Sequence, residues 1–361
     1  MGILITGTSG FLASNFAQYW HRQHPNETIV CLDRVDPTIP IFPEQTEAEP
    51  TTSDSEKIHF IKLDLSIYSP ELAAVMLEHG CDTVIHFAAE QSVNKSWKAG
   101  GEAEFIRNNV GGTRNLLDAA RAVGVHKLHV INTDEVFGSH SLERPDELFD
   151  ESSAYNPQNP YARSKAMQGE IVRDFMDSLH LPKVTMSYHS NNYGPRQKPE
   201  ALIARSFSRR LRQQPITLYE GNQTHTREYT HVSDTCRALE IILTDPSVQH
   251  RDEYCIGSGV EISNQDIANM MLHALRDRTG EDQPADSIQL IQPERPLDDH
   301  RYTMDSSKMR SLGWEPKHTL MTGLQDTIRW YDSPEGRLFV DREQQLQTTT
   351  FEGQTRMTEL R

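Results

Sequence analysis

Thr133, Asp134 and Glu135 place a hydroxyl and two carboxyl groups side by side, directly after the apolar residues 128–131. A buried strand seldom ends in two adjacent carboxylates, because each charge costs free energy unless it is paired or solvated. At the carboxyl edge of a parallel strand, where α/β proteins bind their ligands, the two groups can act as an acid and a base. The tripeptide therefore predicts a proton-transfer site.

A second group of reactive side chains lies between Asn159 and Lys165. Asn159 can cap a helix that opens with Pro160 in its first turn. Tyr161 and Lys165 are then four residues apart on one helix face, where an ammonium group stabilises a phenolate and lowers a pKa that is ordinarily about 10. The phenolate could take a proton from a hydroxyl group while hydride leaves the same carbon. An isolated Tyr-x-x-x-Lys is more simply a pair of exposed residues, but the neighbouring motifs favour catalysis.

The N-terminal turn has the pattern of a dinucleotide site. Gly7 and Gly10 allow a tight turn and a close backbone approach to a pyrophosphate, and the following helix offers its free N–H groups to the anion. Ala13 supplies the third small position. Asp33 lies 20 residues beyond it, at the end of the second apolar run, where a carboxylate can bind ribose hydroxyls and repel a 2′-phosphate. We therefore predict NAD rather than NADP, although Arg34 weakens that preference.

The composition limits the class of partner. The chain has 361 residues, 36% hydrophobic and 24% charged, which suits one large domain or two interleaved ones. A net charge of −16 argues against a general affinity for nucleic acid or for acidic membranes. It does not exclude a small anionic ligand, because a few local donors can hold a phosphate.

The four cysteines are widely spaced and lack a Cys-x-x-Cys pattern, so neither a metal site nor a disulfide framework is predicted. We expect reduced thiols in a cytoplasmic protein. No apolar run reaches membrane-spanning length, and no signal peptide precedes the first strand.

The elements that must position these groups alternate along the chain. Apolar runs predict strands at residues 3–5, 28–32, 58–63, 83–87, 128–131 and 184–188. Helical spacing predicts helices at residues 11–22, 105–123, 234–243, 264–275 and 320–330, in addition to the helix that opens at Pro160. This alternation predicts an α/β fold with a doubly wound, Rossmann-like parallel sheet. Residues 36–57, rich in proline and acidic side chains, are expected to form a mobile surface loop, and the polar residues after Tyr331 a loose tail.

Several motifs together resemble the extended short-chain dehydrogenase/reductases. They are Gly-x-x-Gly-x-x-Ala at Gly7, Tyr-x-x-x-Lys at Tyr161, Phe87-Ala88-Ala89-Glu90, Asn191-Asn192-Tyr193-Gly194-Pro195 and Arg295-Pro296. The run from Thr133 to Gly138 resembles a narrower group, the nucleotide-sugar 4,6-dehydratases, and most closely those acting on dTDP-glucose. The family's epimerases and decarboxylases usually lack the Asp-Glu pair. The resemblance extends from Gly2 to about Tyr331 and is interrupted at residues 36–57.

The resemblance implies a three-step cycle. Tyr161, helped by Lys165 and Thr133, removes the 4-hydroxyl proton as hydride passes from C4 to NAD⁺. Glu135 then removes the C5 proton, Asp134 protonates the departing 6-hydroxyl, and hydride returns to C6. This division requires Glu135 ionised and Asp134 protonated, and neighbouring carboxyls in a dry site split their pKa values in this way.

The resemblance also implies binding residues and domains. NAD is expected to contact Gly7, Gly10, Phe11, Leu12, Asp33, Asp64, Leu65, Ala88, Ala89, Asn108, Tyr161, Lys165 and Asn192. The nucleotide sugar is expected to contact Glu90, Gln91, Thr133, Asn191, Leu202, Arg227, Asn264 and Arg295. Residues 1–190, with a returning segment at 228–256, should form the NAD-binding domain. Residues 191–227 and 257–331 should form a smaller substrate domain, followed by the polar tail at 332–361. A homodimer joined by the helix at 105–123 and the helix that carries Tyr161 is implied as well.

The sequence departs from the dTDP-glucose pattern near the substrate. Ala201 replaces a usual lysine, Gln91-Ser92 replaces Ser-His or Thr-His, and Asn94 replaces an aspartate. The reaction type is therefore better supported than the nucleotide or the sugar. The alternatives are a UDP-glucose 4,6-dehydratase, another UDP-sugar epimerase or decarboxylase, and a non-catalytic NAD-binding regulator.

Overall fold

The structure, a computed structural model, describes residues 2–42, 57–144, 146–178, 181–280, 287–296 and 300–359, with side chains described as far as residue 346. Its main feature is a seven-stranded sheet in the order β10-β6-β5-β4-β1-β2-β3, in which every neighbouring pair is parallel. The strands are β1 (Gly2–Thr6), β2 (Thr28–Asp33), β3 (Ile58–Lys62), β4 (Cys81–His86), β5 (Lys127–Thr133), β6 (Lys183–His189) and β10 (Glu253–Ile256). The predicted doubly wound sheet is confirmed.

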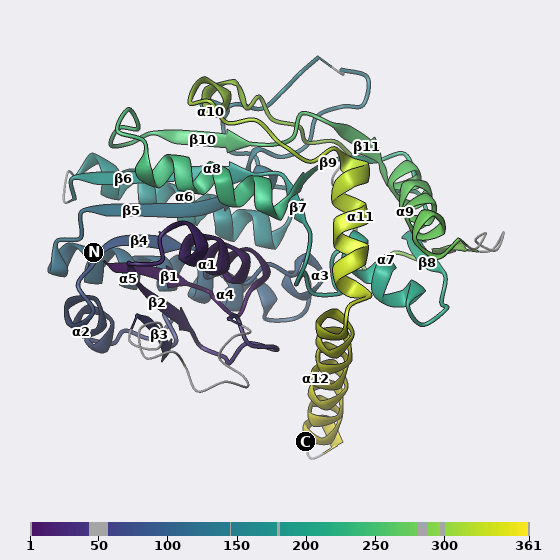
Figure 1. The fold of residues 1–361 in the computed structure, drawn as a ribbon, viewed down its shortest axis with the longest axis horizontal. Helices are drawn as coiled ribbons and strands as arrows, with labels where there is room; N and C mark the ends of the chain where they lie inside the picture. The colour runs from purple at the N-terminus through teal and green to yellow at the C-terminus, as the bar shows by residue number, and fades with distance from the viewer. Residues whose placement is uncertain are drawn as a thin grey trace.

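Helices cover both faces of this sheet (Figure 1). On one face lie α1 (Phe11–Gln23) and α8 (Val232–Thr244); on the other lie α2 (Glu71–Glu78), α5 (Gly112–Val123) and α6 (Pro160–Asp177). All five residues of β1 are buried, as expected for a central parallel strand with both faces covered. Successive strands are added toward one edge of the sheet from β1 to β3 and toward the other edge from β4 onward, so the strand order reverses between β1 and β4. Ligands of such folds bind at this point, beyond the carboxyl ends of the strands.

One predicted helix is more complex than expected. Residues 105–123 were expected to form a single helix, but α4 (Gly101–Phe105) and α5 are joined by the π-helix η2 (Ile106–Gly111). The wider turn of a π-helix is found most often at functional sites. Here it contains Asn108, one of the residues expected to contact NAD.

A second, smaller core lies beside the large sheet. It contains a three-stranded sheet of β11 (Glu261–Ser263), β9 (Thr226–His231) and β7 (Asn191–Tyr193), and a parallel pair of β12 (Ile288–Ile291) and β8 (Ile216–Tyr219). Helices α7 (Leu202–Arg210), α9 (Asn264–Thr279) and α11 (Leu320–Tyr331) pack around them, with buried residues that form a cluster of their own. A smaller C-terminal unit is thus present, and the domain boundaries given above stay predictions.

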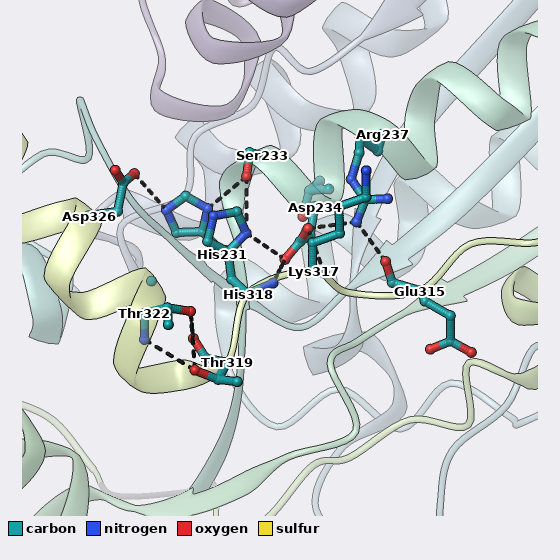
Figure 2. Close-up of polar contacts among 12 residues, drawn as sticks. His231, Ser233, Asp234, Arg237, Glu315, Lys317, His318, Thr319, Thr322 and Asp326 are labelled. Atoms are coloured by element: carbon teal, nitrogen blue, oxygen red, sulfur yellow. Dashed lines mark hydrogen bonds and ion pairs between the residues drawn. The ribbon is translucent and has the colours of Figure 1, made fainter.

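A polar junction fastens the end of β9 to the chain that leads into α11 (Figure 2). The buried Asp234 carboxylate accepts hydrogen bonds from the backbone N–H groups of Lys317 and His318 and from Arg237. Burial alone would raise the pKa of Asp234, but the bonds from His318 and Arg237 outweigh it and hold that pKa well below its usual range. His231 stacks on His318 with ring centroids 4.1 Å apart. The junction therefore fixes the strand that carries Arg227.

The prediction of a mobile surface loop at residues 36–57 is wrong for the first part of this segment. Ile39, Ile41 and Phe42 are buried, and Arg196 donates a hydrogen bond of 2.7 Å to the carbonyl of Pro40. Apolar side chains alternate with the prolines in this segment, and these side chains are the ones that pack against the rest of the protein. The remaining residues, 43–56, lie outside the described part of the chain.

The prediction of a loose tail after Tyr331 is also wrong. Residues Pro334–Glu359 form helix α12, which continues from the end of α11 and projects away from the sheets (Figure 1). Phe339 and Val340 are 4% and 3% exposed and belong to the smaller core. Two apolar residues of this polar segment therefore cover that core. None of the helices in the described ranges is long and apolar enough to cross a membrane.

We expect Phe339→Ala to lower the free energy of unfolding by about 3 kcal/mol, because it removes a buried aromatic side chain. Its neighbour Leu338 is 45% exposed, so Leu338→Ala should change that free energy by less than about 0.5 kcal/mol. Urea unfolding of both variants measures the difference. Equal losses would mean that α12 does not pack as described.

Candidate active site

The turn between β1 and α1 has the shape that a phosphate requires. Gly7 has φ 77°, and a Cβ there would lie 2.8 Å from the backbone N and Cα of Ala88, so only glycine fits. Gly10 precedes α1 and provides no side-chain cap, which leaves the first N–H groups of the helix available to an anion. The Asp33 carboxylate accepts hydrogen bonds from Ser9 N at 2.9 Å and Val35 N at 3.2 Å. The residues present therefore fit a dinucleotide.

The other residues expected to contact NAD follow the strands along the same edge of the sheet. Asp64 and Leu65 follow β3, Ala88 and Ala89 follow β4, and Phe11 and Leu12 open α1. The Nδ2 atom of Asn108 is buried and has no hydrogen-bond partner within the described ranges. Buried donors are usually hydrogen-bonded, so this atom is available to a bound ligand.

Asn192 differs from these residues. Its side-chain amide donates to Ser190 O at 2.9 Å and accepts a hydrogen bond from the Thr235 hydroxyl. Its side chain therefore holds β7 in place in this structure, and contact with a cofactor would require these bonds to open.

Thr133 links the two proposed catalytic units. Its hydroxyl donates to Asp134 Oδ1 at 3.1 Å, accepts from Glu135 N at 3.4 Å and is hydrogen-bonded to Tyr161. Thr133 ends β5 in extended conformation, and residues Asp134–Phe137 turn at once into the 3₁₀-helix η3. This sharp turn brings the carboxyl groups of η3 near the phenol of Tyr161 in α6.

Asp134 is a buried carboxyl group whose surroundings favour its protonated form. Only 2% of the residue is exposed, and Oδ2 has no hydrogen-bond partner among the residues that the structure describes. Burial, followed by the negative charges of Glu135 and Glu228, raises the pKa of Asp134 well above its usual range. A neutral carboxyl can donate a proton, as the sequence required of this residue.

Glu135 is held by Asn159, whose side-chain amide donates to Glu135 Oε2 at 2.9 Å. Asn159 also caps α6 by accepting a hydrogen bond of 2.8 Å from Ala162 N. The sequence predicted the helix cap, but not the second bond. A single residue thus starts the helix of Tyr161 and orients the neighbouring carboxylate.

The predicted influence of Lys165 on Tyr161 is not what the structure shows. Burial, followed by the charge of Glu135, raises the pKa of the Tyr161 phenol, while the bond to Thr133 opposes this rise. Lys165 Nζ donates instead to the carbonyl of Ile131 at 2.8 Å and to the Gln168 side chain. The prediction that the phenol pKa is lowered is therefore wrong, because the effect of burial is larger than that of the hydrogen bond with Thr133.

A buried chain of hydrogen bonds explains where Lys165 is held. Gln168 accepts from Lys165 and donates to Thr113 Oγ1 at 2.7 Å. The His86 ring lies between Thr113 Oγ1 and Thr6 Oγ1, 2.8 Å from each. Burial lowers the pKa of Lys165 to about 7 and that of His86 to about 3. The chain therefore joins the lysine of α6 to the end of β1 without any carboxylate.

The residues expected to hold the substrate lie at the junction of the two cores. Arg227 stacks on Tyr302, 4.5 Å from its ring centroid, and Arg295 donates to Asn94 Oδ1 at 2.9 Å. Asn264 begins α9 and donates to Asn222 O at 2.8 Å. The sequence could not indicate these partners, because they come from distant elements.

The remaining candidates are placed as follows: Asn191 in β7, Leu202 at the start of α7, Gln91 exposed, and Glu90 in ion pairs with Arg34 and Lys95. The ion pair of Glu90 with Arg34 joins the segment after β4 to the segment after β2, across the point between β1 and β4 where the strand order reverses. In the described ranges, no group of three or more His, Cys, Asp or Glu side chains is arranged to hold a metal ion.

Comparison with known proteins gives a consistent result. Residues 4–327 match the family model described as GDP-mannose 4,6 dehydratase. The dTDP-glucose 4,6-dehydratase of Neisseria gonorrhoeae is 34% identical over 91% of this chain and 95% of its own length. A trifunctional enzyme of Arabidopsis thaliana, named for UDP-glucose 4,6-dehydratase and two further activities, is 32% identical over 91% of this chain and 47% of its own length. The dTDP-glucose 4,6-dehydratase of Bacillus anthracis, solved in complex with NAD, has a TM-score of 0.79 at 29% identity, covering 93% of this chain and 97% of its own.

Asp134→Asn should stabilise the protein increasingly as the pH rises. The native state keeps the proton of Asp134 above the pH at which the unfolded chain loses it, so folding is penalised as pH rises through that window. Asparagine resembles the protonated acid and does not titrate. We expect the gain over the parent to grow by about 1 kcal/mol per pH unit from about pH 4 upward, until the native pKa is reached.

Urea unfolding at several pH values checks this expectation. The control is Asp118→Asn, since Asp118 is an exposed residue of α5. A constant difference between Asp134→Asn and the parent across this range would show that Asp134 is ionised in the native state.

Proposed function

The chain belongs to the family of NAD-dependent nucleotide-sugar 4,6-dehydratases within the extended short-chain dehydrogenase/reductases, and we propose that it removes water from a nucleotide-activated hexose, with dTDP-glucose as its substrate. The single observation that carries this proposal is the pair at the end of β5. Asp134 is a buried acid that retains its proton, and Glu135 is a base oriented by Asn159. Removal of water from adjacent carbons needs one group of each kind.

The residues divide the proton transfers among three atoms. In its phenolate form, which the hydrogen bond with Thr133 favours, the Tyr161 oxygen takes the proton of the 4-hydroxyl. Oε1 or Oε2 of Glu135 takes the proton from C5 once the neighbouring C4 is a ketone. The buried Asp134 carboxyl gives its proton to the 6-hydroxyl, which leaves as water. Thr133 is hydrogen-bonded to the Tyr161 phenol, to Asp134 Oδ1 and to the backbone N–H of Glu135, and would thereby hold these three residues around a single hexose ring.

NAD would supply the redox chemistry, by accepting hydride from C4 and returning it at C6. Gly7, Gly10 and the open N-terminus of α1 would hold its pyrophosphate, and Asp33 its adenosine ribose. The bond between Asp33 and Ser9 N keeps this carboxylate beside the glycine turn, where it disfavours a 2′-phosphate.

The nucleotide diphosphate would be held by two arginines of the smaller core. Planar guanidinium groups can bind phosphate oxygens through two parallel hydrogen bonds. Arg227 is steadied by the ring of Tyr302 and Arg295 by Asn94. Relatives named for dTDP-glucose support the choice of nucleotide, and the relative named for UDP-glucose makes that compound the second substrate to test.

We also propose a homodimer that works in the cytoplasm. Trp97, which lies directly after the short helix α3 (Val93–Ser96), and Met167 in α6 are each 39% exposed, so this side of the molecule offers apolar area to a partner copy. The cysteines Cys31, Cys81, Cys236 and Cys255 are free buried thiols, which suits a reducing compartment.

Incubation with dTDP-glucose, UDP-glucose and other nucleotide hexoses tests the function. We expect a 4-keto-6-deoxy product, identified by mass spectrometry as the loss of one water, with dTDP-glucose consumed fastest. Failure to lose water from any of these compounds would contradict the dehydratase proposal. Faster turnover of UDP-glucose would leave the reaction in place and correct the nucleotide.

Glu135→Gln should stop the cycle after C4 is oxidised, because no group remains to take the C5 proton. We expect product formation and the exchange of the C5 hydrogen with deuterated solvent both to fall by about 100-fold or more. Glu170→Gln, an exposed change on the helix of Tyr161, is the control. An unchanged rate in Glu135→Gln would remove Glu135 from the role of base.

A further inference from the structure

Gln168 is a fully buried polar residue that the proposed cycle does not use. It lies in α6, three residues beyond Lys165, and is 0% exposed. Its side-chain oxygen accepts a hydrogen bond from Lys165 Nζ, and its Nε2 atom donates to Thr113 Oγ1 at 2.7 Å. A buried amide costs free energy unless both of its ends are hydrogen-bonded. Both ends of Gln168 are bonded, so the side chain is held in a single position.

The charge on Lys165 decides which way round the Gln168 amide is held. An ammonium group has three N–H donors and no acceptor. Lys165 Nζ donates to the carbonyl of Ile131 at 2.8 Å and to the oxygen of Gln168. A reversed amide would place its NH₂ group against the ammonium, where donor would face donor. These two oxygens are the partners of Nζ among the described residues, so a third N–H of Lys165 remains for a ligand.

Donor and acceptor counts fix the next links of the chain. The Thr113 hydroxyl donates its one proton to the carbonyl of Asn109 at 2.6 Å. Its oxygen therefore accepts both from Gln168 and from His86 Nε2, which lies 2.8 Å away. His86 thus carries its proton on Nε2 and is neutral, in keeping with the burial that lowers its pKa to about 3.

The far end of the chain is the glycine turn of the cofactor site. His86 Nδ1 accepts from the hydroxyl of Thr6 at 2.8 Å, and Thr6 Oγ1 accepts from Ala88 N at 3.2 Å. The backbone of Ala88 lies directly against Gly7. A continuous buried chain of hydrogen bonds thus runs from Lys165 to the turn expected to bind the pyrophosphate, and Gln168 is its first link.

Titratable groups approach Lys165 from three elements. Tyr161 lies one turn before it in α6, His86 comes from β4 and His189 from β6. Burial, followed by the charge of Lys165, lowers the pKa of each histidine to about 3, so both rings are neutral. Burial also lowers the pKa of Lys165 itself, to about 7. In the described part of the chain no carboxylate compensates for this burial, so the ammonium depends on the two oxygens that accept its hydrogen bonds.

We propose that Gln168 is a positioning residue for the oxidation of C4, which holds the Lys165 ammonium at β5 and leaves its third N–H for the cofactor. This inference rests on the proposed function, in which Lys165 assists Tyr161 and contacts NAD. Gln168 is neutral, so it holds the ammonium without cancelling its charge. That charge stays in place to stabilise the Tyr161 phenolate.

Two substitutions of Gln168 test this hold through the pKa of Lys165, read from its ¹³Cε signal by NMR without substrate. Gln168→Met keeps the length of the side chain and removes the acceptor, so the pKa of Lys165 should fall by about one pH unit. Gln168→Glu pairs the ammonium with a carboxylate, so that pKa should rise by about one pH unit or more. Asp174→Asn, an exposed change on the same helix, should leave it unchanged. The same pKa of Lys165 in both Gln168 variants and the parent would overturn the proposal.

Calorimetric titration with NAD gives a second readout, because Lys165 is expected to contact the cofactor. At pH 8 we expect Kd to be about tenfold larger in Gln168→Met than in the parent, since fewer molecules carry the ammonium. Gln168→Glu should bind NAD at least as tightly as the parent at this pH. The loss in Gln168→Met should shrink toward pH 6, where more of the lysine is charged. A loss of the same size at every pH would show that Gln168 only fills space, and would overturn the proposal.

Both readouts are made without a nucleotide sugar, which separates this inference from the proposed function. Changes in the pKa of Lys165 as expected, with no water lost from any nucleotide hexose by the wild type, would reject the dehydratase function alone. If Gln168→Met does not fold, Gln168→Glu still decides the matter. A pKa of Lys165 that does not rise with a carboxylate at position 168 would contradict the contact between the two side chains.

Discussion

The burial of Asp134 beside Glu135 is the constraint on which the rest of the site depends. Two carboxyl groups at adjacent positions cannot both be charged in a dry site without a large cost, so one of them keeps its proton. The fold decides which one it is. Asp134 is turned inward with an oxygen that lacks a partner in the described structure, while Glu135 is met by the amide of Asn159. The proposed acid and base would thereby be made from two residues of similar intrinsic strength.

The architecture serves this pair in two ways. The parallel sheet brings the ends of β1, β2, β4 and β5 to one edge, so that the glycine turn and the carboxyl pair lie at the same edge. The chain after β12 returns to the core of the large sheet, where Met304 bridges Phe149 and its N–H donates to Glu228 in β9. Cofactor binding and acid–base chemistry thus come from different parts of the chain and meet at the end of β5.

Much of this could be predicted from the sequence because the signals are local. Apolar runs and their spacing gave the strands and helices of the large sheet, and the motifs at Gly7, Thr133 and Tyr161 gave the reactive groups. What could not be predicted depends on distant contacts. Lys165 bonds to Gln168 and to a backbone carbonyl rather than lying beside an ionised phenol, since burial sets the balance of charge there. The helix after Tyr331 looked like a tail, because its composition is polar and only a few of its residues reach the core.

Neutron diffraction from a deuterium-exchanged crystal at neutral pD directly observes which of Asp134 and Glu135 carries a proton in the resting protein. We expect deuterium on the Asp134 carboxyl and none on Glu135, whose Oε2 accepts a deuteron from the Asn159 amide. Deuterium on Glu135, or a bare carboxylate at Asp134, would contradict the assignment of acid and base.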